Sequence, residues 1–133
     1  MISYLFDTNA VIALIGRKSD RLVSRILGSP QGSIGVSSIV VYELYFGAQK
    51  SAKVKHNLET LRLLLEDFPT IEFDRSDAFF AGGVRAFLAA KGTPIGPYDV
   101  LIAGQTKARD LTLVTSNVGE FERVEGLRVE DWT

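Results

Sequence analysis

The sequence contains no cysteine and a single histidine, His56, among its 133 residues. The absence of cysteine excludes a disulfide framework, a cysteine-ligated zinc site, a thiol nucleophile and an iron–sulfur cluster. One histidine likewise excludes any site that needs two or more. His56 lies in a polar, lysine-bearing stretch, so we expect it at the surface rather than in a site.

A strong excess of charge and long apolar runs are also missing. The chain has 15 Lys and Arg against 16 Asp and Glu, which gives a net charge of −1. Taken alone, this balance lacks the basic signature of many nucleic-acid binders. No run approaches the roughly 18 apolar residues of a membrane span, and the N-terminus does not resemble a signal peptide. We therefore expect a cytoplasmic protein with no membrane partner.

Short apolar runs alternate with longer amphipathic ones, which is typical of a single α/β domain, residues 1–133, with a mainly parallel sheet. The segment 116–123 is predicted to be a polar loop. The predicted strands cover residues 2–6, 33–37, 70–73, 111–115 and 127–129. The predicted helices cover residues 10–15, 19–27, 39–50, 54–67 and 97–108, with one more that is capped by Asp74 or Ser76 and runs to Ala90.

Asp7 and Glu43 are acidic residues in apolar surroundings. Asp7 directly follows the first predicted strand, and open parallel sheets bind ligands beyond the carboxyl ends of their strands. Its alternative role is a helix N-cap, for which Thr8 or Asn9 would serve as well. Glu43 lies in the sequence SIVVYELYFG, where an unpaired carboxylate is costly to bury. Its alternative is a surface glutamate that is paired or reaches solvent.

Asp99 and Glu120 occupy comparable places later in the chain. Pro97 suits the first position of a helix, which puts Asp99 in the first turn, where the helix dipole favours a carboxylate. Stabilisation of the helix start is therefore an alternative role for Asp99. Glu120 lies after the fourth predicted strand, and its alternative is an ordinary exposed loop charge.

These four positions can converge at one end of a parallel sheet. Several carboxylates share a pocket as ions only when a cation offsets their repulsion. Oxygen ligands without nitrogen or sulfur favour Mg²⁺ or Mn²⁺. A hydrated divalent ion can lower the pKa of its water, orient a phosphodiester and stabilise the charge on its oxygens. The pattern therefore indicates phosphodiester hydrolysis.

Nearly the whole chain resembles the PIN-domain ribonucleases and, among them, the VapC-type toxins of type II toxin–antitoxin systems. The matching pieces are LFDTN at 5–9, SIVVYELYFGA at 38–48, GTPIGPYDVLIA at 92–103 and LVTSN at 113–117, with EF at 120–121 and the segment 126–132. The resemblance implies a three-layer α/β/α sandwich around a mainly parallel sheet. It also implies a Mg²⁺- or Mn²⁺-dependent endoribonuclease that cleaves structured RNA and leaves 5′-phosphate and 3′-hydroxyl ends.

The resemblance also implies roles for individual residues. Asp7 and Asp99 correspond to the principal metal ligands, and Glu43 and Glu120 complete the catalytic acidic pocket. Many relatives have aspartate where this chain has Asn117, so we assign the fourth acidic position to Glu120. The residues expected to orient these carboxylates by hydrogen bonds are Asn9, Thr115, Ser116 and Asn117.

By the same resemblance we expect a homodimer and a hetero-oligomer with a cognate VapB-type antitoxin, whose arginine suits the acidic pocket. Tyr42, Tyr45, Phe46 and the leucines of 54–67 form more apolar surface than two short helices need, although core packing is the alternative. The sequence PIGPYD at 94–99 resembles relatives that cleave initiator tRNA.

Two rival functions are a metal-dependent phosphatase and a catalytically inert binding domain. The first lacks support because no Asp-x-Asp motif follows the first strand and no P-loop is present. The second is disfavoured because Asp7, Glu43 and Asp99 are all present. Basic clusters at 17–25 and 50–62 either contact RNA phosphates or form solvated helix faces. Without the four pocket carboxylates, 12 acidic residues oppose 15 basic ones, so the net charge does not exclude RNA.

Overall fold

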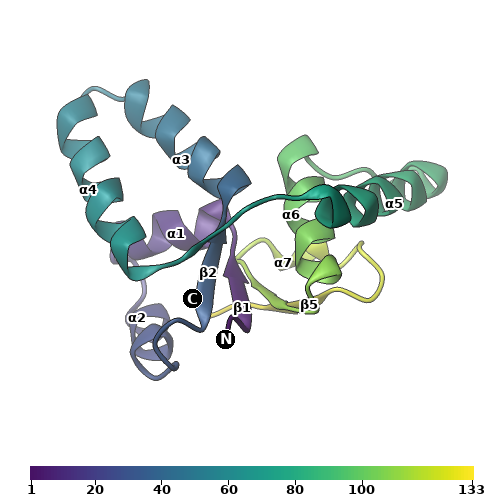
Figure 1. Ribbon diagram of the computed structural model, residues 1–133, viewed down its shortest axis with the longest axis horizontal. Coiled ribbons are helices and arrows are strands. Elements are labelled where there is room, and N and C mark those ends of the chain that lie inside the picture. The colour runs from purple at the N-terminus through teal and green to yellow at the C-terminus, as the bar shows by residue number, and fades with distance from the viewer.

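The computed structural model describes residues 1–133 as five strands and seven helices around one sheet (Figure 1). The strands are β1 (Tyr4–Phe6), β2 (Ile34–Ser37), β3 (Thr70–Ile71), β4 (Thr112–Val114) and β5 (Arg128–Glu130). The helices are α1 (Thr8–Ile15), α2 (Asp20–Leu27), α3 (Ser38–Gln49), α4 (Val54–Asp67), α5 (Arg75–Lys91), α6 (Pro97–Ala108) and α7 (Val118–Phe121).

The sheet has the order β3-β2-β1-β4-β5, and every neighbouring pair of strands is parallel. The chain therefore moves outward from β1 to β3, returns across the sheet to β4, and then continues outward to β5. Because crossovers between parallel strands are right-handed, α1 to α4 cover one face and α5 to α7 cover the other. The three-layer α/β/α sandwich expected from the sequence is confirmed.

Several helix starts follow the predicted capping chemistry. The Ser37 side chain caps α3, Asp74 forms a capping box with Asp77 at the start of α5, and Pro97 is the first residue of α6. The predicted start of α1 at residue 10 is two residues late, because Asp7 itself is the N-cap. The prediction of a loop over 116–123 is wrong in part, since residues 118–121 form the one-turn helix α7.

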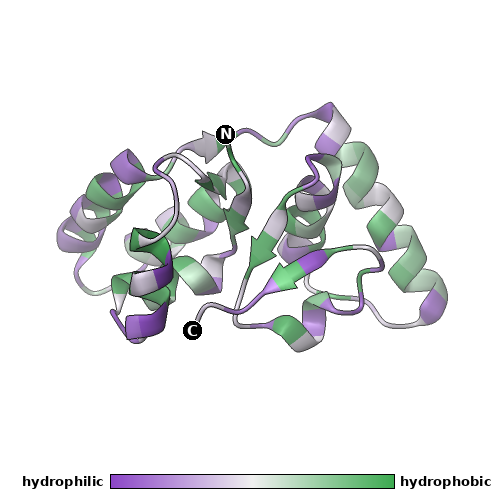
Figure 2. Ribbon diagram, turned by 90° about the horizontal axis from the view of Figure 1, so that it is seen from below, coloured by the Kyte–Doolittle hydropathy of each residue, from purple (hydrophilic) through white to green (hydrophobic).

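The core is built around β1, which is covered on both faces. Leu5 and Phe6 are fully buried, and the strands at the centre of the molecule are mainly hydrophobic in Figure 2. Trp132, near the C-terminus, packs edge-on against Tyr4 and Phe6 with ring centroids 4.9 and 5.5 Å apart. No helix of the structure combines the length and the apolar character that crossing a bilayer requires.

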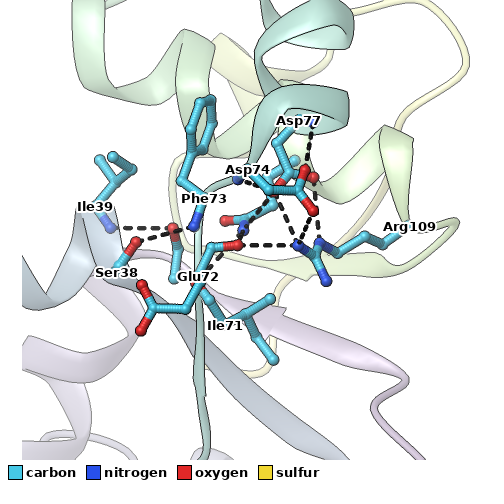
Figure 3. Close-up of polar contacts among 10 residues, drawn as sticks. Ser38, Ile39, Ile71, Glu72, Phe73, Asp74, Asp77 and Arg109 are labelled. Atoms are coloured by element: carbon cyan, nitrogen blue, oxygen red, sulfur yellow. Dashed lines mark hydrogen bonds and ion pairs between the residues drawn. The ribbon is translucent and has the colours of Figure 1, made fainter.

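A polar network joins the start of α5 to the end of α6 (Figure 3). The Asp77 carboxylate is 1% exposed and accepts hydrogen bonds from Arg109 at 2.9 Å and Gln105 at 3.1 Å. Burial opposes ionisation of Asp77, but these bonds and the Asp74 backbone N–H outweigh it and hold the pKa below its ordinary value. Just before α5, the Phe73 N–H donates to the hydroxyl of Ser38, the first residue of α3. The network therefore fixes α6 relative to α3.

Helices α5 and α6 approach each other closely at Gly104. A Cβ atom on Gly104 would lie 2.3 Å from the Cα and 2.4 Å from the backbone N of Ala81 on α5. Those atoms belong to the backbone, so they cannot move aside without separating the helices. Glycine at this position is therefore required by the packing of the layer that carries α6.

We predict that Gly104→Ala lowers the free energy of unfolding by about 2 kcal/mol, because overpacking of a close contact costs about 1 to 3 kcal/mol. The matched control is Gly83→Ala on α5, where an added Cβ meets nothing within 4 Å. There alanine should raise stability by about 0.5 kcal/mol through helix propensity. Urea unfolding of both variants measures the difference. Equal stability of the two variants would contradict the close contact.

Candidate active site

Four carboxylates gather at the edge of the sheet where the parallel strands end. Asp7 follows β1, Glu43 lies in the second turn of α3 after β2, and Glu120 lies in α7 after β4. Asp99 joins them from the first turn of α6. Each aspartate feels the charges of Glu43 and Glu120, and Asp99 also feels that of Asp7. We call these four residues the acidic pocket.

Asp7 is both a helix cap and a member of the pocket. Its side chain is 2% exposed, and Oδ1 accepts a hydrogen bond from the Ala10 N–H at 2.8 Å while Oδ2 accepts one from the Thr115 hydroxyl. Burial raises the pKa of Asp7 to about 6, against the lowering effect of these two hydrogen bonds. Glu43 and Glu120 raise it further by repulsion. The two roles considered for Asp7 are therefore compatible.

Glu43 is oriented by a residue that sequence reasoning considered only as a possible cap. The Thr8 hydroxyl donates to Glu43 Oε1 at 2.8 Å, across 35 residues of sequence. Glu43 is partly buried, and no hydrogen bond occupies its second oxygen. Thr8 follows Asp7 directly, at the end of β1. This position beside a predicted site residue was the one feature of the sequence that could have indicated a role for Thr8 in the site.

Glu120 is held by donors from two segments. Its Oε1 accepts from the Gly96 N–H at 2.8 Å, and its Oε2 accepts from the Asn117 side-chain amide. The Asn117 N–H in turn donates to the Thr115 hydroxyl at 2.9 Å, which links this group to Asp7. Asn117 thus donates to the acidic group instead of supplying a charge, and Glu120 brings the fourth carboxylate.

Gly96 also permits the close approach of two acidic side chains. A Cβ atom at this position would lie 3.1 Å from Asp99 Oδ2 and 3.7 Å from Glu120 Oε1. Sequence reasoning identified the loop that contains Gly96 but not this contact. Glycine suits this crowded position, because its backbone N–H donates to Glu120 and it has no side chain to meet the two carboxylates.

Asp99 is the most perturbed carboxyl group of the pocket. Burial raises its pKa to about 7, and the charge of Glu120 and a hydrogen bond to it add to the effect, followed by the charges of Asp7 and Glu43. None of the ion pairs in the protein includes a residue of the acidic pocket. The four carboxylates therefore share the pocket without a cationic side chain to neutralise them.

Two residues expected to orient the carboxylates make no contact with them by hydrogen bond. The Asn9 and Ser116 side chains are exposed, and neither makes a hydrogen bond to the pocket. His56 is exposed, as predicted. The basic clusters are partly neutralised by surface ion pairs, since Arg25 pairs with Glu130 and Arg62 pairs with acidic residues of its own helix.

The chemistry of the pocket fits a hard divalent cation. As the side chains stand, no group of three or more His, Asp or Glu residues is placed to hold a metal ion. The available donors are nevertheless all oxygens, and two of the carboxyl groups have raised pKa values because they are buried and, in addition, lie close to like charges. Mg²⁺ and Mn²⁺ favour such donors and retain waters in their coordination shell, so they need few protein ligands.

We predict that the protein without divalent cations becomes less stable as the pH rises from about 4 to about 7. Carboxyl groups with raised pKa values keep protons in the folded state that the unfolded chain has lost, so their contribution to stability falls over this range. Asp99→Asn should reduce this fall and raise the melting temperature at pH 8. The control is Glu122→Gln, which removes an exposed carboxylate outside the pocket. Identical pH profiles for Asp99→Asn and the wild type, measured with a chelator present, would contradict this prediction.

Comparison with known proteins places the chain in a family. Residues 4–127 match the family model described as PIN domain. The tRNA(fMet)-specific endonuclease VapC of Salmonella typhimurium is 39% identical over 132 residues, which cover 99% of each chain, and the protein of the same name from Shigella flexneri is 38% identical over 100% of each. The crystal structure of DNA-bound VapBC from Salmonella typhimurium contains a chain that matches with a TM-score of 0.96 and 38% identity over 100% of both chains. The protein therefore belongs to the PIN-domain family, in the group of VapC proteins.

Proposed function

We propose that this protein is a Mg²⁺- or Mn²⁺-dependent endoribonuclease and the toxin of a type II toxin–antitoxin system. The observation that carries the proposal is the acidic pocket, in which four carboxylates converge without a protein cation. RNA phosphates would be repelled from such a pocket unless a bound cation offset its charge. The ribonuclease activity named for its full-length relatives supports the same chemistry.

Asp7 and Asp99 are the residues that we expect to hold the ion. Asp99 makes a hydrogen bond to the Glu120 carboxyl, and no backbone N–H or hydroxyl group donates to it, so a cation competes only with that carboxyl contact for its oxygens. Asp7 keeps its orientation through Ala10 and Thr115. A bound Mg²⁺ or Mn²⁺ supplies charge stabilisation at the scissile phosphate and lowers the pKa of its water.

Glu43 and Glu120 have different surroundings and suit different tasks. Glu120 is fixed on both oxygens by Gly96 and Asn117, so it contributes charge at a defined place. Glu43 is fixed only at Oε1 by Thr8, which leaves Oε2 free to accept a proton from the attacking water. No covalent intermediate on the protein is required.

The proposed substrate is structured RNA, with a tRNA as the first candidate. Two relatives with 38 to 39% identity are named tRNA(fMet)-specific endonucleases. The sequence PIGPYD at 94–99 also resembles that of relatives that cleave initiator tRNA, so initiator tRNA is the substrate to test first.

The proposed partner is a VapB-type antitoxin in a hetero-oligomer that also contains a dimer of this chain. A groove of about 270 Å³ between α1, α3 and α4 reaches the acidic pocket, because Thr8 and Glu43 are among its lining residues. Exposed Ile12 and Ile15 contribute apolar surface to it. An apolar segment of the antitoxin fits this groove, and an arginine at its end suits the carboxylates. The similar Salmonella chain comes from a DNA-bound VapBC complex, which supports an antitoxin partner for this chain.

We predict that the purified protein cleaves initiator tRNA in the presence of Mg²⁺ or Mn²⁺ and stops when a chelator is added. Asp7→Asn and Asp99→Asn should each lower kcat by about 100-fold or more, because each removes a proposed metal ligand. Thr115→Val should lower it by about 10- to 100-fold through loss of the hydrogen bond that orients Asp7. Sequencing of RNA 5′ ends locates the cut.

The control for these variants is Glu122→Gln, which removes an acidic charge outside the pocket and should cleave like the wild type. Full activity of Asp7→Asn and Asp99→Asn, or cleavage that resists the chelator, would overturn the assignment of the acidic pocket. Cleavage of other structured RNA in preference to tRNA would overturn only the choice of substrate.

A further inference from the structure

Two tyrosines form a partly exposed aromatic pair at the rim of the acidic pocket. Tyr42 on α3 and Tyr98 on α6 have ring centroids 5.6 Å apart and ring planes inclined at 58°. Their hydroxyl oxygens lie 3.4 Å apart, within hydrogen-bond distance. Tyr42 is 54% exposed and Tyr98 is 41% exposed. We call these residues the tyrosine pair.

The tyrosine pair adjoins the pocket on both helices. Tyr42 directly precedes Glu43, and Tyr98 directly precedes Asp99. The charge of Glu43 reaches Tyr98, where it contributes to a raised pKa behind the larger effect of the hydroxyl contact with Tyr42. Both rings therefore lie beside the carboxylates assigned to the reaction.

Packing of the two helices does not account for this exposure. A pair that served only to join α3 and α6 would bury its rings, yet about half of each side chain is in contact with solvent. Phosphate contacts need positively charged side chains, and the acidic pocket has none. Exposed aromatic rings beside the pocket can bind RNA without positive charge. Base–aromatic stacking contributes this affinity for any base, because every base has a flat π-face.

We propose that the tyrosine pair stacks an unpaired RNA base next to the scissile phosphate, a role that rests on the proposed ribonuclease function. The base stacks on the outer face of one ring, since lying between them would need about 3.5 Å on each side and the centroids are only 5.6 Å apart. The second ring holds the first ring in place by packing against it. Because a stacked base must leave its helix, the pair selects cleavage in loops or bulges over duplex RNA.

The first experiment measures steady-state cleavage of an RNA stem-loop by Tyr42→Leu, Tyr98→Leu and the double variant. Leucine keeps an apolar side chain but removes the ring, so KM should rise about tenfold, as expected for loss of one stacked base. Tyr42→Phe and Tyr98→Phe keep the ring, so the KM of each should equal that of the wild type. The matched control is Phe79→Leu in the exposed pair Phe79 and Phe80 on α5, whose centroids are 5.7 Å apart; its KM should not change.

Removal of the base itself distinguishes stacking from a structural role. An abasic nucleotide beside the cut should raise KM about tenfold for the wild type and have no further effect on the double leucine variant. A merely structural role of the tyrosines would make the two effects multiply. Unchanged KM in the leucine variants, or multiplied effects, would overturn the proposal while leaving the ribonuclease function intact.

A binding experiment tests the tyrosine pair without relying on cleavage. RNA that carries 4-thiouridine in its loop is irradiated with the protein, and mass spectrometry identifies the attached residue. Crosslinks at Tyr42 or Tyr98 support stacking even if the wild type fails to cleave, a failure that would overturn the proposed function alone. Crosslinks confined to other surfaces would overturn the stacking role, and absence of any RNA binding would overturn both.

Discussion

The repulsion among four carboxylates in one pocket is the constraint around which the functional end of this molecule is organised. Asp7, Glu43, Asp99 and Glu120 come from different elements, and none of them has a cationic side chain as a partner. The pKa values of about 6 for Asp7 and about 7 for Asp99 follow mainly from burial, with like charges adding to it. A bound divalent cation would relieve this repulsion, which links the stability of the fold to the proposed activity.

The fold brings these groups together through the reversal of strand order at the centre of the sheet. β1 and β4 are adjacent although more than 100 residues separate them, so Asp7 lies beside the segment that carries Thr115 and Glu120. Helix α6 must then present Asp99 from the opposite layer. The close contact of Gly104 with Ala81 and the Asp77 network fix α6 in that position. Packing far from the pocket therefore determines where one of its carboxylates lies.

The sequence was sufficient to predict the α/β class and most elements, because these depend on local signals. The four acidic residues were chosen for their places around a parallel sheet, and the structure brings them to one edge of it. Hydrophobic periodicity identifies β1 and α4, and capping residues identify the starts of α3 and α5. Helix α7 was missed because its four residues are too few for a periodic pattern. The prediction that Asn9 and Ser116 orient the pocket came from the family resemblance, whereas both residues are exposed in the structure.

Contacts between distant segments could not be predicted in this way. The bond from Thr8 to Glu43 and the bond from the Gly96 N–H to Glu120 depend on how helices lie across the sheet, which periodicity does not specify. The proximity of Tyr42 to Tyr98 is of the same kind, although the position of each tyrosine beside an acidic residue was visible in the sequence. In this protein, residues that directly adjoin a predicted site residue in the sequence also lie at the site.

Calorimetric titration of Mn²⁺ into the protein at pH 6.5, in two buffers with different ionisation enthalpies, tests the central claim most directly. Asp7 and Asp99 are partly protonated at this pH, so we predict that binding releases protons and that Asp99→Asn weakens both binding and proton release. Equal Mn²⁺ affinity in the wild type, Asp7→Asn and Asp99→Asn, with no proton release, would contradict a metal site in the acidic pocket.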